Sequence, residues 1–161
     1  MTTPYRITTV CTGNICRSPM AEFMVANAAA QAGLNVEVDS AGTSAWELGN
    51  PMDPRALAEL ARHGISATGH TARTFNPAWF AERDLILALD IDHYEDLQAL
   101  APNTAAAAKV RMLRSFDPAV AHLEPAQQGI YDPWYGNAKD FAVSWDLIEA
   151  ALPGIVAHAR G

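Results

Sequence analysis

Residues 11–19 read CTGNICRSP and bring together side chains that can act on a bound anion. A thiol, Cys11, stands six positions before a guanidinium, Arg17, with the turn-forming pair Gly13-Asn14 between them. An apolar run precedes this segment and an Ala- and Met-rich stretch of helical spacing follows it, so we expect a loop that joins a strand to a helix. Backbone N–H groups and the positive end of the helix dipole in such a loop bind oxyanions such as phosphate.

Cysteine attacks as its thiolate, and a free cysteine is mostly protonated at neutral pH. The loop N–H groups, the helix dipole and Arg17 all favour the charged form of Cys11, which makes it a candidate nucleophile. A planar guanidinium also grips two phosphate oxygens and faces the charge that develops as phosphorus is attacked. The candidate phosphate-binding residues are Thr12, Gly13, Asn14, Ile15, Cys16 and Arg17. The alternative, a buried Cys11 and a solvated Arg17, leaves the agreement between motif and context unexplained.

Two further side chains of this loop bear on the Cys11 sulfur. The Ser18 hydroxyl is placed to donate to it and to help it leave in a second step, although the position also fits a plain helix N-cap. Cys16 lies close enough in the same turn to form a reversible disulfide with Cys11 that protects the nucleophile from irreversible oxidation. An inert small residue in the loop wall is the alternative for Cys16.

Cleavage of a phosphate ester needs a proton for the leaving oxygen, and hydrolysis of a cysteinyl phosphate needs a base for water. One carboxyl can perform both tasks in turn. The stretch 115–137, rich in proline and aromatic residues and without a clear period, offers Asp117, Glu124 and Asp132. Asp117 and Asp132 both precede a proline, but aromatic neighbours that lower the local dielectric favour Asp132. A turn-capping aspartate is the alternative for either.

Apolar runs alternate with helical patterns along the chain, which predicts a parallel sheet with crossover helices. We expect strands at 5–10, 36–40, 85–89 and 110–113, and helices at 19–32, 54–63, 92–100 and 138–151, with a short one near 77–82. The alanine tract 105–108 fits a loop or a helix end, and Pro153-Gly154 makes the last helix kink or restart. Since no linker or repeat divides the chain, we expect one α/β domain over residues 1–161.

Composition narrows the class of protein. The 161 residues are half hydrophobic, enough for a substantial core, and the net charge of −7 argues against nucleic-acid binding, which needs a basic face. Two cysteines in one loop indicate a reducing compartment. The first residues lack a signal-peptide pattern and no apolar run reaches the ~20 residues of a membrane span. We therefore expect a cytoplasmic protein, with non-classical export left open, and no membrane partner, metal or cofactor; a monomer is favoured.

The chain resembles the low-molecular-weight protein tyrosine phosphatases. The resemblance rests on CTGNICRSP, on Ser40-Ala41-Gly42-Thr43, on Trp46 with Gly49-Asn50-Pro51, on Gly69-His70, and on Asp132-Pro133-Trp134-Tyr135-Gly136, in the family's order. It implies a three-layer fold, with a four-stranded parallel sheet and helices on both faces. It implies Cys11 as nucleophile, Arg17 as phosphate and transition-state binder, and Asp132 as general acid. It also implies that Asn14, Ser40 and His70 form a hydrogen-bond network that holds the loop.

The walls of the expected pocket bear on substrate choice. Ile15, Trp46, Trp134 and Tyr135 form a slot suited to the phenyl ring of a phosphotyrosine in a protein substrate. Core or surface packing is the alternative for the two tryptophans, and many relatives carry Tyr in the place of Trp134. Relatives that cleave phosphoarginine have Thr in the place of Ile15, so the aliphatic side chain favours aryl phosphates. The other histidines, His63, His93, His122 and His158, are interpreted as surface or capping residues.

Three other functions compete with a tyrosine phosphatase. One is an arginine phosphatase of the same family. An arsenate reductase of the same fold is the second, but that chemistry passes electrons along additional cysteines further down the chain, and none follows Cys16. The third is a non-catalytic phosphate-binding module, which is expected to lack the nucleophile or the acid.

Overall fold

Four apolar segments pair into a parallel sheet in the computed structural model, which describes residues 3–161. The strands are β1 (Tyr5–Cys11), β2 (Val36–Gly42), β3 (Leu85–Ala88) and β4 (Val110–Met112). Their order across the sheet is β2-β1-β3-β4, so the strand that leads into the CTGNICRSP loop has a neighbour on each side. Because parallel strands end at the same edge, the segments that follow β1, β2 and β3 meet there.

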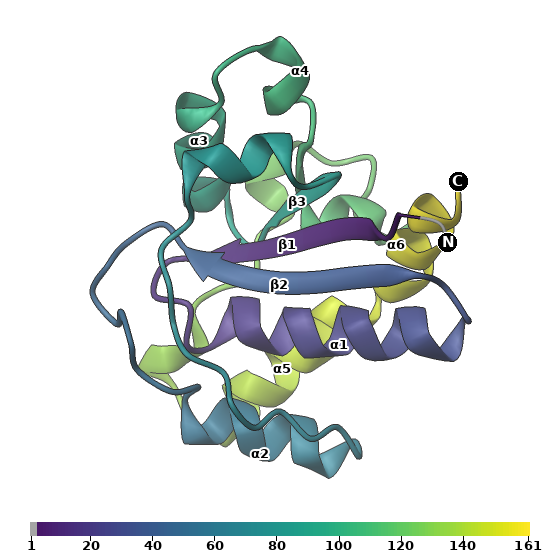
Figure 1. Cartoon of the computed structure of the whole chain (residues 1–161). Helices are drawn as coiled ribbons and strands as arrows, with labels where there is room; N and C mark the ends of the chain where they lie inside the picture. The colour runs from purple at the N-terminus through teal and green to yellow at the C-terminus, as the bar shows by residue number, and fades with distance from the viewer. Residues whose placement is uncertain (1–2) are drawn as a thin grey trace.

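Helices cover both faces of the sheet, as Figure 1 shows. On one side lie α1 (Arg17–Gln31), α5 (Ala138–Glu149) and α6 (Leu152–Arg160), with α2 (Pro54–Arg62) packed against α1 and α5. On the other side lie α3 (Ile91–Leu100) and the short α4 (Thr104–Ala107). Single 3₁₀ turns are η1 (Pro77–Ala81), η2 (Leu113–Phe116), η3 (Pro125–Gln127) and η4 (Pro133–Tyr135). This is the three-layer α/β fold expected from the sequence.

Two apolar clusters hold the layers together. The larger cluster contains Ile7, Met24 and Phe141 and lies on the side of α1, α2, α5 and α6. The smaller cluster contains Val10 and Phe80 and lies on the side of α3. Full burial of one such side chain contributes about 1.5–3 kcal/mol, so β1 is fixed from both faces up to the residue where the loop begins.

The expected boundaries shift by one or two residues at the site. Strand β1 includes Cys11 itself, and α1 begins at Arg17 rather than at Pro19. The N-cap position of α1 is Cys16, which makes no side-chain capping bond. The chain therefore passes from strand to helix through only five residues, 12–16, and no side chain caps the first N–H groups of α1.

The irregular parts of the chain also have defined structure. The alanine tract forms α4, which Asn103 caps by accepting the N–H of Ala106. The last helical pattern restarts: α5 ends at Glu149, and α6 begins with Pro153 in its first turn, where proline is tolerated. No helix within residues 3–161 is both long and apolar enough to cross a membrane.

Candidate active site

The loop after β1 is shaped around Asn14. This residue has a positive φ of 60°, the one non-glycine residue of the described chain in the left-handed region, and it is fully buried. Its side-chain amide donates to Ser18 Oγ (2.8 Å) and Ser40 Oγ (2.9 Å), and its carbonyl oxygen accepts from His70 Nε2 (2.7 Å). The Asn14 Oδ1 atom accepts the backbone N–H of Arg73 (3.0 Å). Asparagine tolerates this conformation, and its contacts keep the loop curved.

These contacts bring Asn14, Ser40 and His70 together as the resemblance implies, and they include a residue that the sequence reasoning missed. Glu22 of α1 accepts the hydroxyl proton of Ser40, and its Oε1 atom lies 3.9 Å from His70 Nδ1. Burial lowers the pKa of His70 although its bond to the Asn14 carbonyl opposes this, and burial raises the pKa of Glu22. Burial thus disfavours the charged forms of both His70 and Glu22 behind the loop.

A close approach of strand β2 also supports the loop. Gly42 pairs with Cys11 in the sheet, and a Cβ atom on Gly42 would lie 2.5 Å from the carbonyl oxygen of Thr12. A backbone oxygen cannot move aside to relieve such a contact, whereas the end of a flexible side chain can. Only glycine allows this fit.

The Cys11 sulfur lies at the end of β1, buried beneath the loop. Ser18 Oγ is 2.9 Å from Cys11 Sγ and accepts the amide proton of Asn14, so its own hydrogen is available to the sulfur or to the carbonyl oxygen of Ala41 at 3.3 Å. Ser18 lies inside α1 and does not cap it, which excludes the N-cap alternative. The hydroxyl is therefore placed to stabilise negative charge on sulfur.

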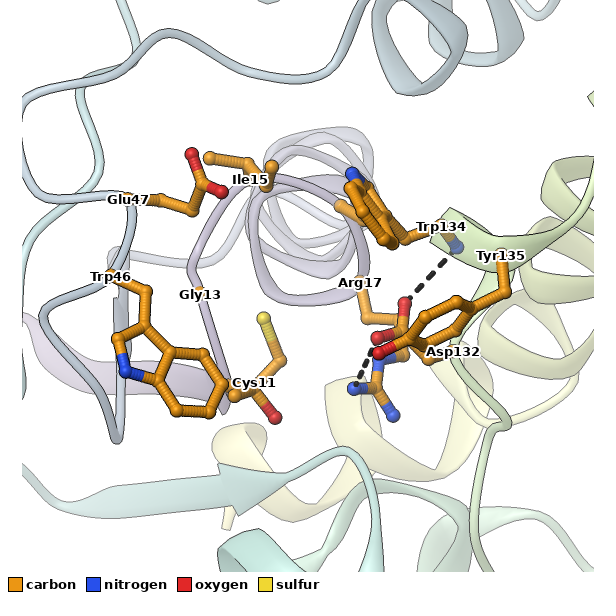
Figure 2. Close-up of a pocket in the computed structure, with 11 residues that line it drawn as sticks. Cys11, Gly13, Ile15, Arg17, Trp46, Glu47, Asp132, Trp134 and Tyr135 are labelled. Atoms are coloured by element: carbon orange, nitrogen blue, oxygen red, sulfur yellow. Dashed lines mark hydrogen bonds and ion pairs between the residues drawn. The ribbon is translucent and has the colours of Figure 1, made fainter.

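Arg17 is buried and held in place from the far side of the cavity. Its Nη1 atom donates to the Ile130 carbonyl oxygen (2.8 Å) and lies 3.5 Å from Asp90 Oδ2, while Nη2 lies 3.6 Å from Asp132 Oδ2. Figure 2 shows the guanidinium between the thiol loop and the segment that carries Asp132. Asp90 was not anticipated; its position just after β3, at the edge where the thiol loop also stands, was the available signal.

Asp132 stands at the start of η4, on the rim of the cavity. Its Oδ1 atom accepts the N–H of Trp134 (3.1 Å), and about a third of its side chain, 34 %, is exposed. Asp117 is buried and caps a turn by accepting the N–H of Ala119 (2.9 Å), and Glu124 is exposed. Of the three acidic candidates, Asp132 lines the cavity with Cys11.

The cavity has a volume of about 370 Å³. Its lining consists of Cys11, Thr12, Gly13, Ile15, Cys16, Arg17, Trp46, Glu47, Asp132, Trp134 and Tyr135. Figure 2 shows Trp46 and Glu47 on one side and Trp134 and Tyr135 on the other. Trp46 and Tyr135 are each 82 % exposed and Trp134 is 49 % exposed, so the tryptophans are rim residues and not core. The Asn14 side chain turns inward to Ser18 and Ser40, and its place among the phosphate-binding residues of the loop stays a prediction.

Cys16 has a different environment from Cys11. Both thiols are free and buried. Burial, and next to it the charge of Asp53, raises the pKa of Cys16 far above its ordinary value. Burial alone would raise the pKa of Asp53, but hydrogen bonds from Arg55 and from the Cys16 thiol outweigh it and lower that pKa. Cys16 is therefore a protonated thiol in the loop wall.

His93 contacts the thiol loop, although no sequence pattern placed it at the site. Its Nδ1 atom accepts the N–H of Asp90 (3.0 Å), which completes a capping box on α3, so the capping interpretation is confirmed. It is not on the surface, since only 2 % of it is exposed, and Nε2 lies 2.8 Å from Thr12 Oγ1. Burial, with Arg17 as the next cause, lowers the pKa of His93 to about 3. The neutral ring therefore donates through Nε2 to the loop.

Comparisons with known proteins agree with this geometry. A profile of the family described as "Low molecular weight phosphotyrosine protein phosphatase" matches residues 6–160. A low molecular weight protein-tyrosine-phosphatase of Streptomyces coelicolor is 48% identical over 158 residues, covering 97% of this chain and 94% of the relative. The phosphatase A of Mycobacterium tuberculosis is 44% identical, covering 96% and 91%. A protein tyrosine phosphatase structure from Entamoeba histolytica, with Hepes in its active site, superposes with a TM-score of 0.85 at 27% identity, covering 95% of each chain.

The chain belongs to the low molecular weight phosphotyrosine protein phosphatases, a family of phosphoric monoester hydrolases. Cys11 and Arg17 occupy the positions expected for the phosphate-binding loop of this family. Its substrates as a class are phosphoproteins.

Proposed function

We propose that the chain hydrolyses phosphotyrosine in proteins by two displacements through a phosphoenzyme on Cys11. One observation carries the proposal: Cys11, Arg17 and Asp132 line a single cavity, with the Ser18 hydroxyl 2.9 Å from the Cys11 sulfur. A nucleophile, an anion-binding group and a carboxyl that faces the leaving group are the parts that such a reaction needs.

In the first step the Cys11 thiolate attacks phosphorus. The S–P bond forms, the P–O bond to tyrosine breaks, and Asp132 gives its proton to the tyrosine oxygen. The loop N–H groups between Thr12 and Arg17 face the phosphoryl oxygens, and the guanidinium of Arg17 stabilises the charge that they carry in the transition state.

In the second step water attacks the phosphoenzyme. Asp132, now a carboxylate, takes a proton from the water, and the S–P bond breaks to release phosphate. The electron pair returns to the Cys11 sulfur, where the Ser18 hydroxyl stabilises the thiolate. No cofactor takes part in either step.

The cavity wall supports an aryl phosphate as the substrate. Trp46 and the pair Trp134 and Tyr135 stand on opposite sides of the opening, and the two rings of the pair meet edge-to-face with centroids 5.0 Å apart. Ile15 offers an apolar surface at the cavity, which suits an aryl ring better than the charged guanidine of a phosphoarginine. We propose phosphotyrosine as the main substrate on this basis.

We further propose that the chain acts as one cytoplasmic domain and as a monomer, with phosphoproteins and not nucleic acid or membrane as partners. The net charge of −7 and the two free thiols support this assignment.

We also propose that Cys11 and Cys16 form a disulfide under oxidising conditions, because both line the same cavity. Two thiols give up two protons and two electrons to an oxidant such as peroxide in that reaction.

A direct comparison of substrates tests the proposed function. The chain is incubated with a phosphotyrosine peptide, a phosphoarginine peptide, para-nitrophenyl phosphate, and arsenate with a thioredoxin system. We expect rapid phosphate release from the phosphotyrosine peptide and the aryl ester. Preferential release from phosphoarginine, or electron transfer to arsenate, would replace the assignment by one of its rivals. Trapping with an Asp132→Ala variant in lysate then identifies the substrate proteins.

A further inference from the structure

Arg55, in the first turn of α2, joins two segments that are distant in sequence. Its Nη1 atom donates to the Gly136 carbonyl oxygen (3.0 Å) and Nη2 donates to that of Trp134 (3.2 Å). Both carbonyls belong to the segment 131–137, which carries Asp132 and which we call the acid loop. Arg55 therefore binds the backbone of the acid loop two to four residues after Asp132.

The other side of the guanidinium is fixed by Asp53. Arg55 Nε and Nη2 donate to the two carboxylate oxygens of Asp53 at 3.1 Å and 2.9 Å, and the backbone N–H of Arg55 adds a third bond of 2.8 Å. The Arg55 Cζ atom also lies 4.6 Å from the centroid of the Phe141 ring. Such paired, two-pronged contacts give a guanidinium a defined orientation, which a lysine does not reproduce.

Asp53 in turn contacts the back of the thiol loop. Its N–H donates to the carbonyl oxygen of Ile15 (2.9 Å). A continuous path of hydrogen bonds thus runs from the wall of the phosphate loop through Asp53 and Arg55 to the acid loop.

The acid loop has a second support, a carboxylate that contacts both of its ends. Asp140 of α5 accepts the Tyr131 hydroxyl (2.6 Å) on one oxygen and the N–H of Asn137 (2.8 Å) on the other. This contact joins the two ends of the acid loop, and a Cβ on Gly136 would lie within 1.9 Å of the same carboxylate. Asp140 contacts both ends of the loop, while Arg55 connects the loop through Asp53 to the thiol loop.

We infer that Arg55 is a positioning residue that holds Asp132 at the leaving-group oxygen, and that it acts on proton transfer and not on phosphate binding. The inference rests on the proposed role of Asp132 as general acid. Displacement of a catalytic group by about 1 Å costs up to roughly a hundredfold in rate, so loss of the Arg55 contacts has a measurable kinetic signature.

The experiment compares Arg55→Met, which keeps an unbranched apolar chain over Phe141, with Arg55→Lys, which keeps the charge. The control is Arg62→Met on the same helix, because Arg62 is exposed and pairs with Glu59 instead of the acid loop. Values of kcat/KM are measured for aryl phosphates from dinitrophenyl to phenyl, together with competitive inhibition by inorganic phosphate and the thermal midpoint of each variant.

We expect Arg55→Met to lower kcat/KM roughly ten- to a hundredfold for phenyl phosphate but only about twofold for dinitrophenyl phosphate, whose leaving group needs no proton. Inhibition by phosphate stays within about twofold of the parent. Arg55→Lys falls between, and Arg62→Met matches the parent. An equal loss on both esters, or weakened phosphate inhibition, overturns the inference.

Asp132→Asn, alone and combined with Arg55→Met, separates this inference from the proposed function. If Asp132→Asn shows no dependence on the leaving group, the acid assignment fails. If it shows that dependence and Arg55→Met still lowers the phenyl phosphate rate in the Asp132→Asn background by the same factor, Arg55 acts elsewhere and the inference alone fails. The combined variant is expected to match Asp132→Asn, and the same comparison with Arg55→Lys serves if Arg55→Met does not fold.

Discussion

The Nη2 atom of Arg17 lies 3.6 Å from Asp132 Oδ2, so the anion-binding group and the proposed acid face each other across the cavity. A phosphate that pairs with this guanidinium would stand beside the same carboxyl, within reach of a proton for the leaving oxygen. The guanidinium keeps its position through the Ile130 carbonyl and Asp90 on its other nitrogen. Arg17 therefore links the proposed phosphate site to the proposed acid.

Replacement of the nucleophile, Cys11→Ser, is expected to abolish turnover while phosphate binding persists. An alcohol is far less ionised than a thiol at neutral pH, but the loop N–H groups and Arg17 remain in place. Turnover of para-nitrophenyl phosphate and calorimetric titration with inorganic phosphate measure the two properties. Retention of most of the activity would remove Cys11 from the nucleophile role.

Asn14 is expected to contribute to folding stability through two separable causes, its side-chain hydrogen bonds and its backbone conformation. Asn14→Ala loses the side-chain bonds to Ser18, Ser40 and Arg73 and carries the strain of a positive φ, which together cost about 2–4 kcal/mol. Asn14→Gly loses the same bonds but relieves the strain. Urea unfolding should therefore rank the parent above Asn14→Gly and Asn14→Gly above Asn14→Ala. Equal stabilities of the two variants would show that the backbone conformation carries no cost.

His93 is expected to make folding stability depend on pH. Its pKa is about 3 in the folded chain, against about 6.5 when unfolded, so the unfolded state binds more protons between these values. This contribution is fully present above about pH 6.5 and is lost as pH falls toward 3, with a slope of at most about 1.4 kcal/mol per pH unit.

Urea unfolding at pH 7 and pH 5 checks this sign. His93→Asn should flatten the loss of stability between the two pH values, because asparagine does not titrate. His122→Asn is the matched control, since His122 is exposed and lies far along the chain from the capping box. An unchanged pH dependence in His93→Asn would mean that other groups are responsible.

Reversible protection of the nucleophile is expected to depend on Cys16. After treatment with peroxide, the parent should regain activity on addition of dithiothreitol, because a disulfide is reducible. Cys16→Ser should lose activity irreversibly, since the oxidised Cys11 then has no partner thiol and proceeds to higher oxidation states. Activity after reduction and the mass of the intact chain give the outcome. Full recovery in Cys16→Ser would exclude the disulfide.

Ile15→Thr is expected to move substrate preference away from tyrosine. A hydroxyl in the wall offers a polar contact to a guanidinium and removes apolar surface from the aryl ring. The ratio of kcat/KM for phosphotyrosine and phosphoarginine peptides measures this, and Val at the same position controls for size. A ratio that is unchanged by Thr would place the discrimination elsewhere on the wall.

The sequence predicted the parts of this site that are contiguous. The apolar run before Cys11 and the helical spacing after Arg17 placed the loop between a strand and a helix, with boundaries wrong by at most two residues at α1. The proline and aromatic context separated Asp132 from Asp117, and the cavity lining agrees. Periodicity and local turn chemistry suffice for features of this kind.

Contacts between distant segments were beyond the sequence. Thr12 and His93 are 81 residues apart, and Arg55 and Gly136 are also 81 residues apart, so no local pattern links either pair. His93 in particular matches an ordinary capping box, and only the sheet order β2-β1-β3 brings that cap against the loop. Asp90 differs from these pairs, because its position just after β3 already places it at the sheet edge where the thiol loop stands.

The contact between Gly42 and Thr12 makes the base of the cavity intolerant of substitution, in contrast to its rim. Any side chain at position 42 would push the floor of the cavity out of shape. The exposed rings of Trp46 and Tyr135 meet no such restriction. Substitutions at the rim are therefore expected to change which phosphate esters enter, while the loop beneath keeps the shape that holds the anion.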